Sequence, residues 1–205
     1  MSVTRAAGAE GCTTLAELVA DFRARLGPEG PLENGYMEWM RESRSLTVAI
    51  DRAVASIKPN GKMHNHQSRV PRSVKQDYAM RLKSVARHLG VCRTFHELLT
   101  WCEDRAVPGI GPVTQYDVAQ RVGEYLGLYP EYVYLHAGVR LGATALGLDV
   151  KGKAWLVQQE LPSALRRLTA NETEDFLCTY RAMFPKMREE VTREFGIIGV
   201  RQSNR

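Results

Sequence analysis

Apolar residues recur at helical spacing along most of the chain. The segment after Thr94 has apolar residues at positions i, i+3, i+4 and i+7, which form one face: Phe95, Leu98, Leu99 and Cys102. Alternating strand patterns are missing apart from short pieces such as Tyr132–Tyr134, which fit a helix equally well. The pattern predicts an all-α protein with helices near 14–26, 34–57, 72–89, 94–105, 112–127, 130–146, 153–168 and 171–195.

Three helix starts carry a capping-box sequence, in which a threonine is followed three residues later by a glutamate. These pairs are Thr14 with Glu17, Thr94 with Glu97, and Thr169 with Glu172. Two segments rich in glycine, proline and polar residues, 27–35 and 58–71, predict loops. We expect a single multi-helix globular domain over 13–195, with disordered tails over 1–12 and 196–205.

One predicted helix carries small residues on a single face. Gly138, Gly142 and Ala145 share that face and would let another helix approach closely. We interpret this pattern as core packing and not as a cofactor site.

Positive charge is concentrated in one part of the chain. The whole protein has a net charge of +5. The segment 58–93 holds nine basic residues and one acid, Asp77, which gives it +8. Such a concentration favours polyanionic partners. On the predicted 72–89 helix, a basic stripe lies beside the apolar one and consists of Arg72, Lys83 and Arg87, with Lys75 at its edge.

Composition narrows the remaining possibilities. The chain has no apolar run long enough to cross a bilayer and no signal-peptide pattern over its first residues. Its four cysteines are widely spaced, which favours reduced thiols in the cytoplasm over a zinc site. We therefore expect a cytoplasmic protein with no membrane partner, no metal and no cofactor.

The segment Val107–Pro112, with the sequence Val-Pro-Gly-Ile-Gly-Pro, carries the clearest candidate chemistry. Two glycines before a helix leave backbone N–H groups open to an incoming anion. Pro108 ends the preceding helix, Ile110 is expected to anchor the turn in the domain, and Pro112 suits the first turn of the next helix.

This segment, with Ala119 and Val122 behind it, resembles the helix-hairpin-helix (HhH) motif of DNA-binding and DNA-repair proteins. The resemblance covers about residues 106–126, within a predicted HhH unit over 94–128. It implies contact with the phosphate backbone of duplex DNA, without sequence specificity. The expected contacts are the backbone of the turn and first helical turn, together with a hydroxyl donor from Thr114: Gly109, Ile110, Gly111, Val113 and Thr114.

The residues after the second glycine are neutral, so the positive charge must come from elsewhere. We expect it from the basic helix and the loop before it, through Lys62, Arg69, Arg72, Lys75, Lys83 and Arg87. The glycine turn and the basic helix also have a purely structural interpretation. The turn would then only connect two packed helices, and the basic stripe would only be a solvated helix face.

The HhH resemblance also raises a DNA glycosylase-like repair enzyme as an alternative. No lysine follows the second glycine, so the lyase form of that chemistry is not expected. Asp117 and Asp149 are candidate carboxylates, but neither has the spacing of the family's catalytic aspartate. In the basic loop, His64 and His66, with Asn65 and Gln67, could meet phosphate, water or a metal. The catalytic residues stay unassigned, and a helical scaffold without a nucleic-acid role is the third alternative.

Overall fold

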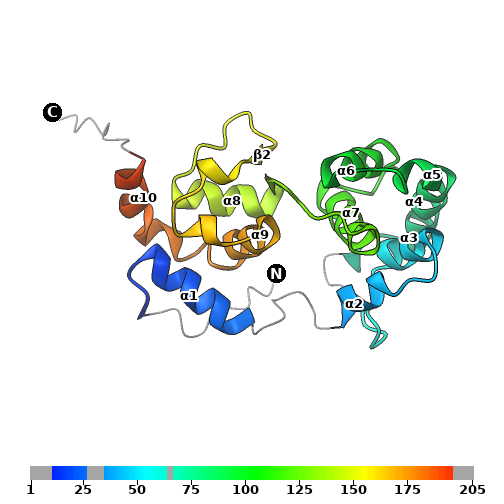
Figure 1. Ribbon diagram of the computed structural model, residues 1–205, viewed down its shortest axis with the longest axis horizontal. Coiled ribbons are helices and arrows are strands. Elements are labelled where there is room, and N and C mark those ends of the chain that lie inside the picture. Colours follow the sequence, from blue (N-terminus) through cyan, green and yellow to red (C-terminus); the bar gives the residue numbers. More distant parts are fainter. Residues whose placement is uncertain (1–10, 27–34, 64–66, 196–205) are drawn as a thin grey trace. The chain divides into compact units, whose positions relative to one another are not determined.

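The computed structural model describes residues 11–26, 35–63 and 67–195. Two compact units make up the chain: one contains residues 1–30 and 132–205, and the other contains residues 31–131 (Figure 1). The predicted all-α class is confirmed, since helices dominate and the only sheet has two strands in the part of the chain described. The expected domain 13–195 thus consists of two units. The expected tail 196–205 and residues 1–10 of the expected tail 1–12 lie outside the described residues, but Cys12 packs against the first unit's core.

The unit 31–131 is wholly helical within its described residues. Its elements are α2 (Tyr36–Arg41), α3 (Leu46–Ala55), α4 (Arg72–Ser84), α5 (Ala86–Leu89), α6 (Phe95–Asp104) and α7 (Pro112–Leu126). Helix α7 packs against α2, α3 and α6, and α3 also packs against α4. The apolar face predicted for α7 is buried through Val118, Ala119 and Val122. Helix α7 is therefore the central element of this unit.

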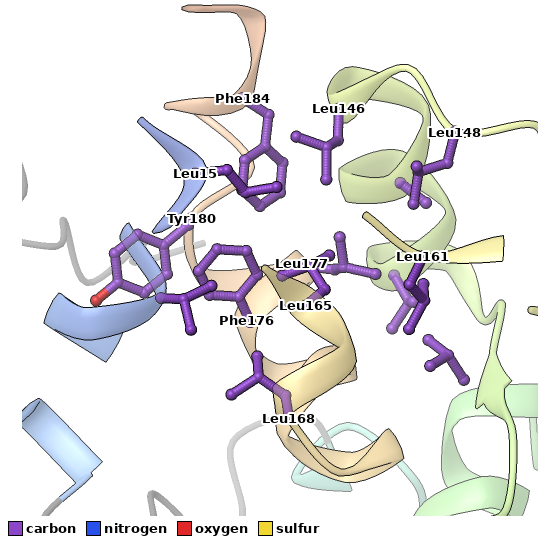
Figure 2. Close-up of a cluster of buried hydrophobic side chains, with 14 of the residues drawn as sticks. Leu15, Leu146, Leu148, Leu161, Leu165, Leu168, Phe176, Leu177, Tyr180 and Phe184 are labelled. Atoms are coloured by element: carbon purple, nitrogen blue, oxygen red, sulfur yellow. The ribbon is translucent and has the colours of Figure 1, made fainter. Parts of the chain in front are cut away.

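The other unit combines helices with short irregular elements. They are α1 (Leu15–Leu26), β1 (Val133–Tyr134), α8 (Ala137–Leu146), β2 (Trp155–Leu156), α9 (Ala170–Thr179) and α10 (Arg188–Glu194), with 3₁₀ turns η3 (Gln158–Glu160), η4 (Leu165–Arg167) and η5 (Phe184–Lys186). Figure 2 shows its core, where Phe176, Tyr180 and Phe184 lie among leucines from several elements. The rings of Phe176 and Tyr180 stack at 5.1 Å between centroids.

The small face of α8 packs closely, as predicted. A Cβ at Gly142 would overlap the backbone carbonyl of Leu177 in α9, and one at Gly138 would lie 2.9 Å from the sulfur of Cys178. The capping boxes of Thr14 with Glu17 and of Thr169 with Glu172 are formed in both directions: the hydroxyl of Thr169 accepts from Glu172 N at 3.2 Å, and the Glu172 carboxylate accepts from Thr169 N at 2.7 Å. At Thr94 only one half is formed, since its hydroxyl accepts from Glu97 N at 3.1 Å but the Glu97 carboxylate accepts from Arg93 N. In each case a local pattern fixes the local structure.

One predicted helix is wrong at its start, and another is wrong in large part. The C-terminal part of the segment expected as helix 130–146 is α8, but β1 precedes it, and the segment expected as helix 153–168 contains β2 and two 3₁₀ turns. The strands pair antiparallel, with Val133 opposite Leu156. Pro162 hinders a continuous helix over 153–168, because a proline inside a helix lacks the backbone donor that its position needs.

Three further predicted helices are interrupted. The 34–57 segment divides before Ser45, whose hydroxyl accepts from Val48 N at 3.3 Å and caps a new helix, α3. The 72–89 segment divides at Val85, which leaves helical geometry. The 171–195 segment divides after Thr179. No helix of the described residues is long and apolar enough to cross a membrane.

Candidate nucleic-acid interface

Helices α6 and α7 pack against each other and are joined by a tight turn (Figure 1). The Ile110 N–H donates to the Val107 carbonyl at 2.9 Å, which closes a turn over Pro108 and Gly109. Gly109 has a φ of +98°, a conformation that strongly favours glycine at this position of the turn. The sequence Val-Pro-Gly-Ile therefore dictates the shape of this connection.

Ile110 is the anchor of the turn, as expected. Its side chain is buried, while Gly109 and Gly111 on either side of it are exposed. The amide of Gln115 in α7 donates to the Ile110 carbonyl at 3.0 Å. The turn is thus held from inside, and its glycine backbone faces outward.

The outward backbone carries unused donors. Within the described residues, the N–H groups of Gly109, Gly111, Val113 and Thr114 make no hydrogen bond. Gly111 is the N-cap of α7 and has no side chain to cap these donors. A Cβ at Gly111 would meet no atom within 4 Å, so the space beside it is open. A helix of 15 residues therefore begins with open donors at an exposed end.

The side chains of the first helical turn contribute less than expected. Thr114 is buried, so its hydroxyl is withdrawn from the surface where an added donor was predicted. Val113 is half-buried. The chemistry of this end of α7 is therefore that of the main chain.

Helix α4 contacts the turn through the flank that carries Val74. Val74 Cγ1 lies 3.3 Å from the position that a Cβ on Gly109 would occupy. At about 100° per residue, Arg72 and Lys83 lie about 160° and 180° around the helix from Val74. Lys83 instead forms an ion pair of 2.8 Å with Asp51 of α3. The predicted basic stripe and the turn therefore lie on opposite flanks of α4.

Lys75 was expected to be a surface cation, and this expectation is wrong. It is only 6% exposed, so it is not one of the exposed cations that a DNA backbone would meet. Burial lowers its pKa, and the charge of Arg121 lowers it further. Arg87 is exposed but follows the helix break at Val85, so it does not continue the stripe of α4.

The loop cations are exposed. Lys62 belongs to a small turn closed by a bridge between Ile57 and Met63. Arg69 lies two residues after Gln67, whose amide donates to Asp117 of α7 at 2.8 Å. Of the predicted cations, Arg69 is the nearest in sequence to this contact with the N-terminal half of α7.

Two further arginines, not predicted, belong to the helices that flank or contact the turn. Arg81 is exposed, seven residues after Val74 and so on the same flank of α4, where it pairs with Asp77 at 3.3 Å. Arg105 follows α6 directly, and its guanidinium lies 5.2 Å from the centroid of the Trp101 ring. Periodicity places Arg81 on the same face of α4 as Val74, two turns further along the helix, and this signal could have identified it.

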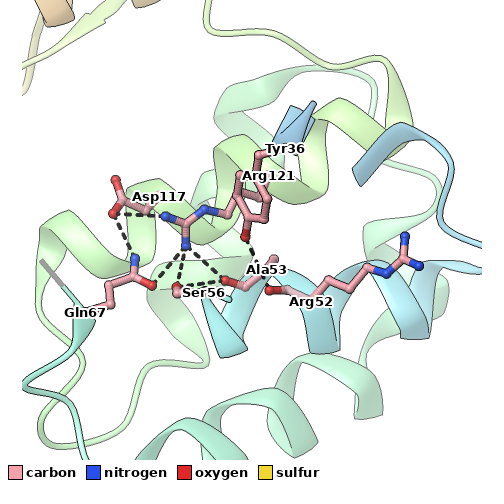
Figure 3. Close-up of polar contacts among 7 residues, drawn as sticks. All are labelled: Tyr36, Arg52, Ala53, Ser56, Gln67, Asp117 and Arg121. Carbon is pink, nitrogen blue, oxygen red and sulfur yellow. Dashed lines mark hydrogen bonds and ion pairs between the residues drawn. The ribbon is translucent and has the colours of Figure 1, made fainter. Parts of the chain in front are cut away.

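Arg121 is the centre of a buried polar network (Figure 3). One of its nitrogens donates to three oxygens: Ala53 O at 3.0 Å, Ser56 Oγ at 2.7 Å and Gln67 Oε1 at 2.9 Å. Another lies 3.6 Å from the carboxylate of Asp117. The network joins α3, α7 and the segment before α4. The spacing of Asp117 and Arg121, four residues apart on one helix, is the sequence signal for this pair.

The candidate catalytic residues are not brought together. Asp117 binds Gln67 and Arg121, which assigns it a structural role, and Asp149 belongs to the other unit, where it pairs with Lys153 at 3.3 Å. Gln67 is fully buried and its amide is used in the network. His64 and His66 lie outside the described residues, as does Asn65. Within the described ranges, no three His, Cys, Asp or Glu side chains cluster as metal ligands would.

Comparison of this chain with protein-family models, with curated proteins and with solved structures gives no match.

Proposed function

We propose that the protein binds duplex DNA through the phosphate backbone, without sequence specificity, at the N-terminus of α7. The observation that carries this proposal is the exposed turn at Gly109 and Gly111, with the N–H groups of Gly109, Gly111, Val113 and Thr114 making no hydrogen bond among the described residues. Phosphate oxygens are strong acceptors, and the helix dipole adds a favourable field at this end. The absence of base-reading side chains in the turn supports contact with the backbone alone.

The cations of the proposed interface differ from those expected from the sequence. The candidates are three arginines. Arg69 lies two residues after Gln67, which contacts α7; Arg81 lies on the same face of α4 as Val74; and Arg105 follows the end of α6. We infer that they supply the long-range attraction and the salt dependence. Lys62, Arg72 and Arg87 are exposed elsewhere on the same unit and add general positive charge.

A role in the cytoplasm is part of this proposal. It is supported by four free cysteines, one of which, Cys102, is fully buried.

A substitution at Gly111 tests the proposal. Gly111→Asp places a carboxylate at the N-cap, where it accepts from the Val113 or Thr114 N–H and removes the donors that phosphate would use. The φ of −87° suits aspartate, and the space is open, so the fold is kept. We expect wild-type protein to bind a fluorescent duplex with strong salt dependence, and the variant to lose at least about tenfold in affinity.

Two controls separate the donors from their surroundings. Gly111→Ala leaves the N–H groups free and should keep most of the binding. Gln159→Glu makes the same change in charge at an exposed position of the other unit and should change affinity little. An affinity that does not depend on salt, or equal binding by Gly111→Asp and wild type, would overturn the proposal.

A further inference from the structure

A groove of about 1060 Å³ lies between α3 and α4, on the flank of α4 that faces away from Gly109. Its lining is largely apolar and includes Val54 and Ala79. Six large apolar side chains are exposed in the described part of the chain, and three of them line this groove: Ile57, Met63 and Met80. A gathering of exposed apolar side chains in a concave surface indicates a binding site.

The wall of the groove contains a buried cation without an anion. Lys75 is 6% exposed, and its ammonium contacts only the sulfur of Met63, at 3.3 Å, among the described residues. A thioether is a weak acceptor and cannot balance a positive charge. An uncompensated ammonium in such surroundings attracts an anion strongly, because the low local dielectric weakens screening.

The other charges at the groove leave an excess of positive charge. Among the described residues of the lining, Asp51 is the one acid, and Lys83 pairs with it at 2.8 Å. Arg72 is exposed at the rim, at the start of α4. The groove thus offers an apolar floor, a buried ammonium and a guanidinium, with no free carboxylate to repel an anion.

We propose that this groove binds a small organic anion, whose acidic head group pairs with Lys75 beside Arg72 and whose apolar tail covers Ile57, Met63 and Met80. A neutral apolar ligand leaves the ammonium unpaired, and a wholly polar anion gains nothing from the apolar floor. The site lies on the opposite flank of α4 from the α6–α7 turn and does not depend on the proposed DNA binding.

Calorimetric titration of the full chain with three eight-carbon probes tests this proposal. Octanoate and octyl phosphate carry an acidic group, and octan-1-ol has the same chain without a charge. We expect either acid to bind at least about tenfold tighter than the alcohol, since a hydrogen bond to a charged group is worth that factor or more. A preference between the two acids identifies the head group as carboxylate or phosphate.

Lys75→Met is the decisive variant, because methionine keeps the length and apolar stem of the side chain. It should lower acid affinity about tenfold and leave alcohol affinity unchanged. Lys186→Met, at an exposed lysine of the other unit, should change neither. Equal binding of acid and alcohol, undiminished acid binding by Lys75→Met, or no binding of any probe up to its solubility limit would overturn the proposal.

A second readout uses the unaltered protein. Carbon-13 NMR of labelled lysine follows the pKa of Lys75, which burial lowers in the free state. Octanoate should raise this pKa by supplying a counter-charge, whereas octan-1-ol should not raise it. An unchanged Lys75 signal at saturating octanoate would contradict the assigned contact, whatever the stability of the variant.

Discussion

Val74 in α4 lies directly against Gly109 in the turn before α7, with its Cγ1 3.3 Å from where a Cβ on Gly109 would be. The contact links the turn to a helix that precedes it by more than 20 residues in the sequence. Gly109 is therefore required twice, for its φ of +98° and for the space beside Val74. Gly111, two residues later, has neither requirement.

This contrast predicts different effects of the same substitution. Gly109→Ala should lower the free energy of unfolding by about 1–3 kcal/mol, because alanine is strained at positive φ and crowds Val74. Gly111→Ala should lower it by roughly 0.5 kcal/mol, since alanine is only a poorer N-cap than glycine. Urea unfolding measures both. Equal losses in the two variants would mean that the turn does not need its observed geometry.

The parts of the fold that could be predicted depend on contacts close in sequence. Helices α6 and α7, the turn between them and the burial of Ile110 all follow from proline, glycine and apolar spacing within about 30 residues. The capping pair of Thr169 and Glu172 is equally local. The close packing of Gly142 also follows, because a face of small residues has few other uses.

The parts that could not be predicted depend on distant partners. Strand β1 exists because Val133 pairs with Leu156, and no pattern within Tyr132–Tyr134 reveals that partner. Lys75 is a different case, because it lies on the same face of α4 as Tyr78, Ala79 and Leu82. This face is turned toward the core, so it buries a lysine that its charge would assign to the surface.

The lowered pKa of Lys75 predicts a pH dependence of stability. A lysine with a depressed pKa in the folded state loses its proton before the unfolded chain does, so the unfolded state holds more protons in that pH window. Charged Lys75 therefore lowers the free energy of unfolding at neutral pH. This loss disappears as the pH rises from the pKa of Lys75 in the folded state to its pKa in the unfolded chain. Lys75→Met removes the penalty and should raise the free energy of unfolding at pH 7 by about 1 kcal/mol.

The gain from Lys75→Met should shrink as the pH approaches that ordinary value of 10.5. Urea unfolding of wild type and variant at pH 7 and at higher pH measures the difference between them. A gain that is the same at every pH would show that the substitution acts through packing alone.

The Arg121 network predicts a large loss from a single substitution. Arg121→Met leaves Ser56, Gln67 and Asp117 without their shared donor in a buried region, and we expect a loss of about 3–5 kcal/mol in the free energy of unfolding. Arg81→Met is a matched control, because Arg81 forms the same four-residue pair with Asp77 on an exposed surface. It should cost about 0.5 kcal/mol or less. Similar losses in both variants would show that burial does not set the strength of this network.

The contact between α8 and α9 predicts a steric effect in the other unit. Gly142→Ala puts a methyl group into the carbonyl of Leu177, which is backbone and cannot rotate away, so the two helices must separate. We expect a loss of about 1–3 kcal/mol, together with faster amide exchange in α8 and α9. Leu141→Ala, at the neighbouring residue of α8 that is 60% exposed, should cost about 0.5 kcal/mol or less. If the larger loss came from Leu141→Ala, the close approach at Gly142 would not be what holds these helices together.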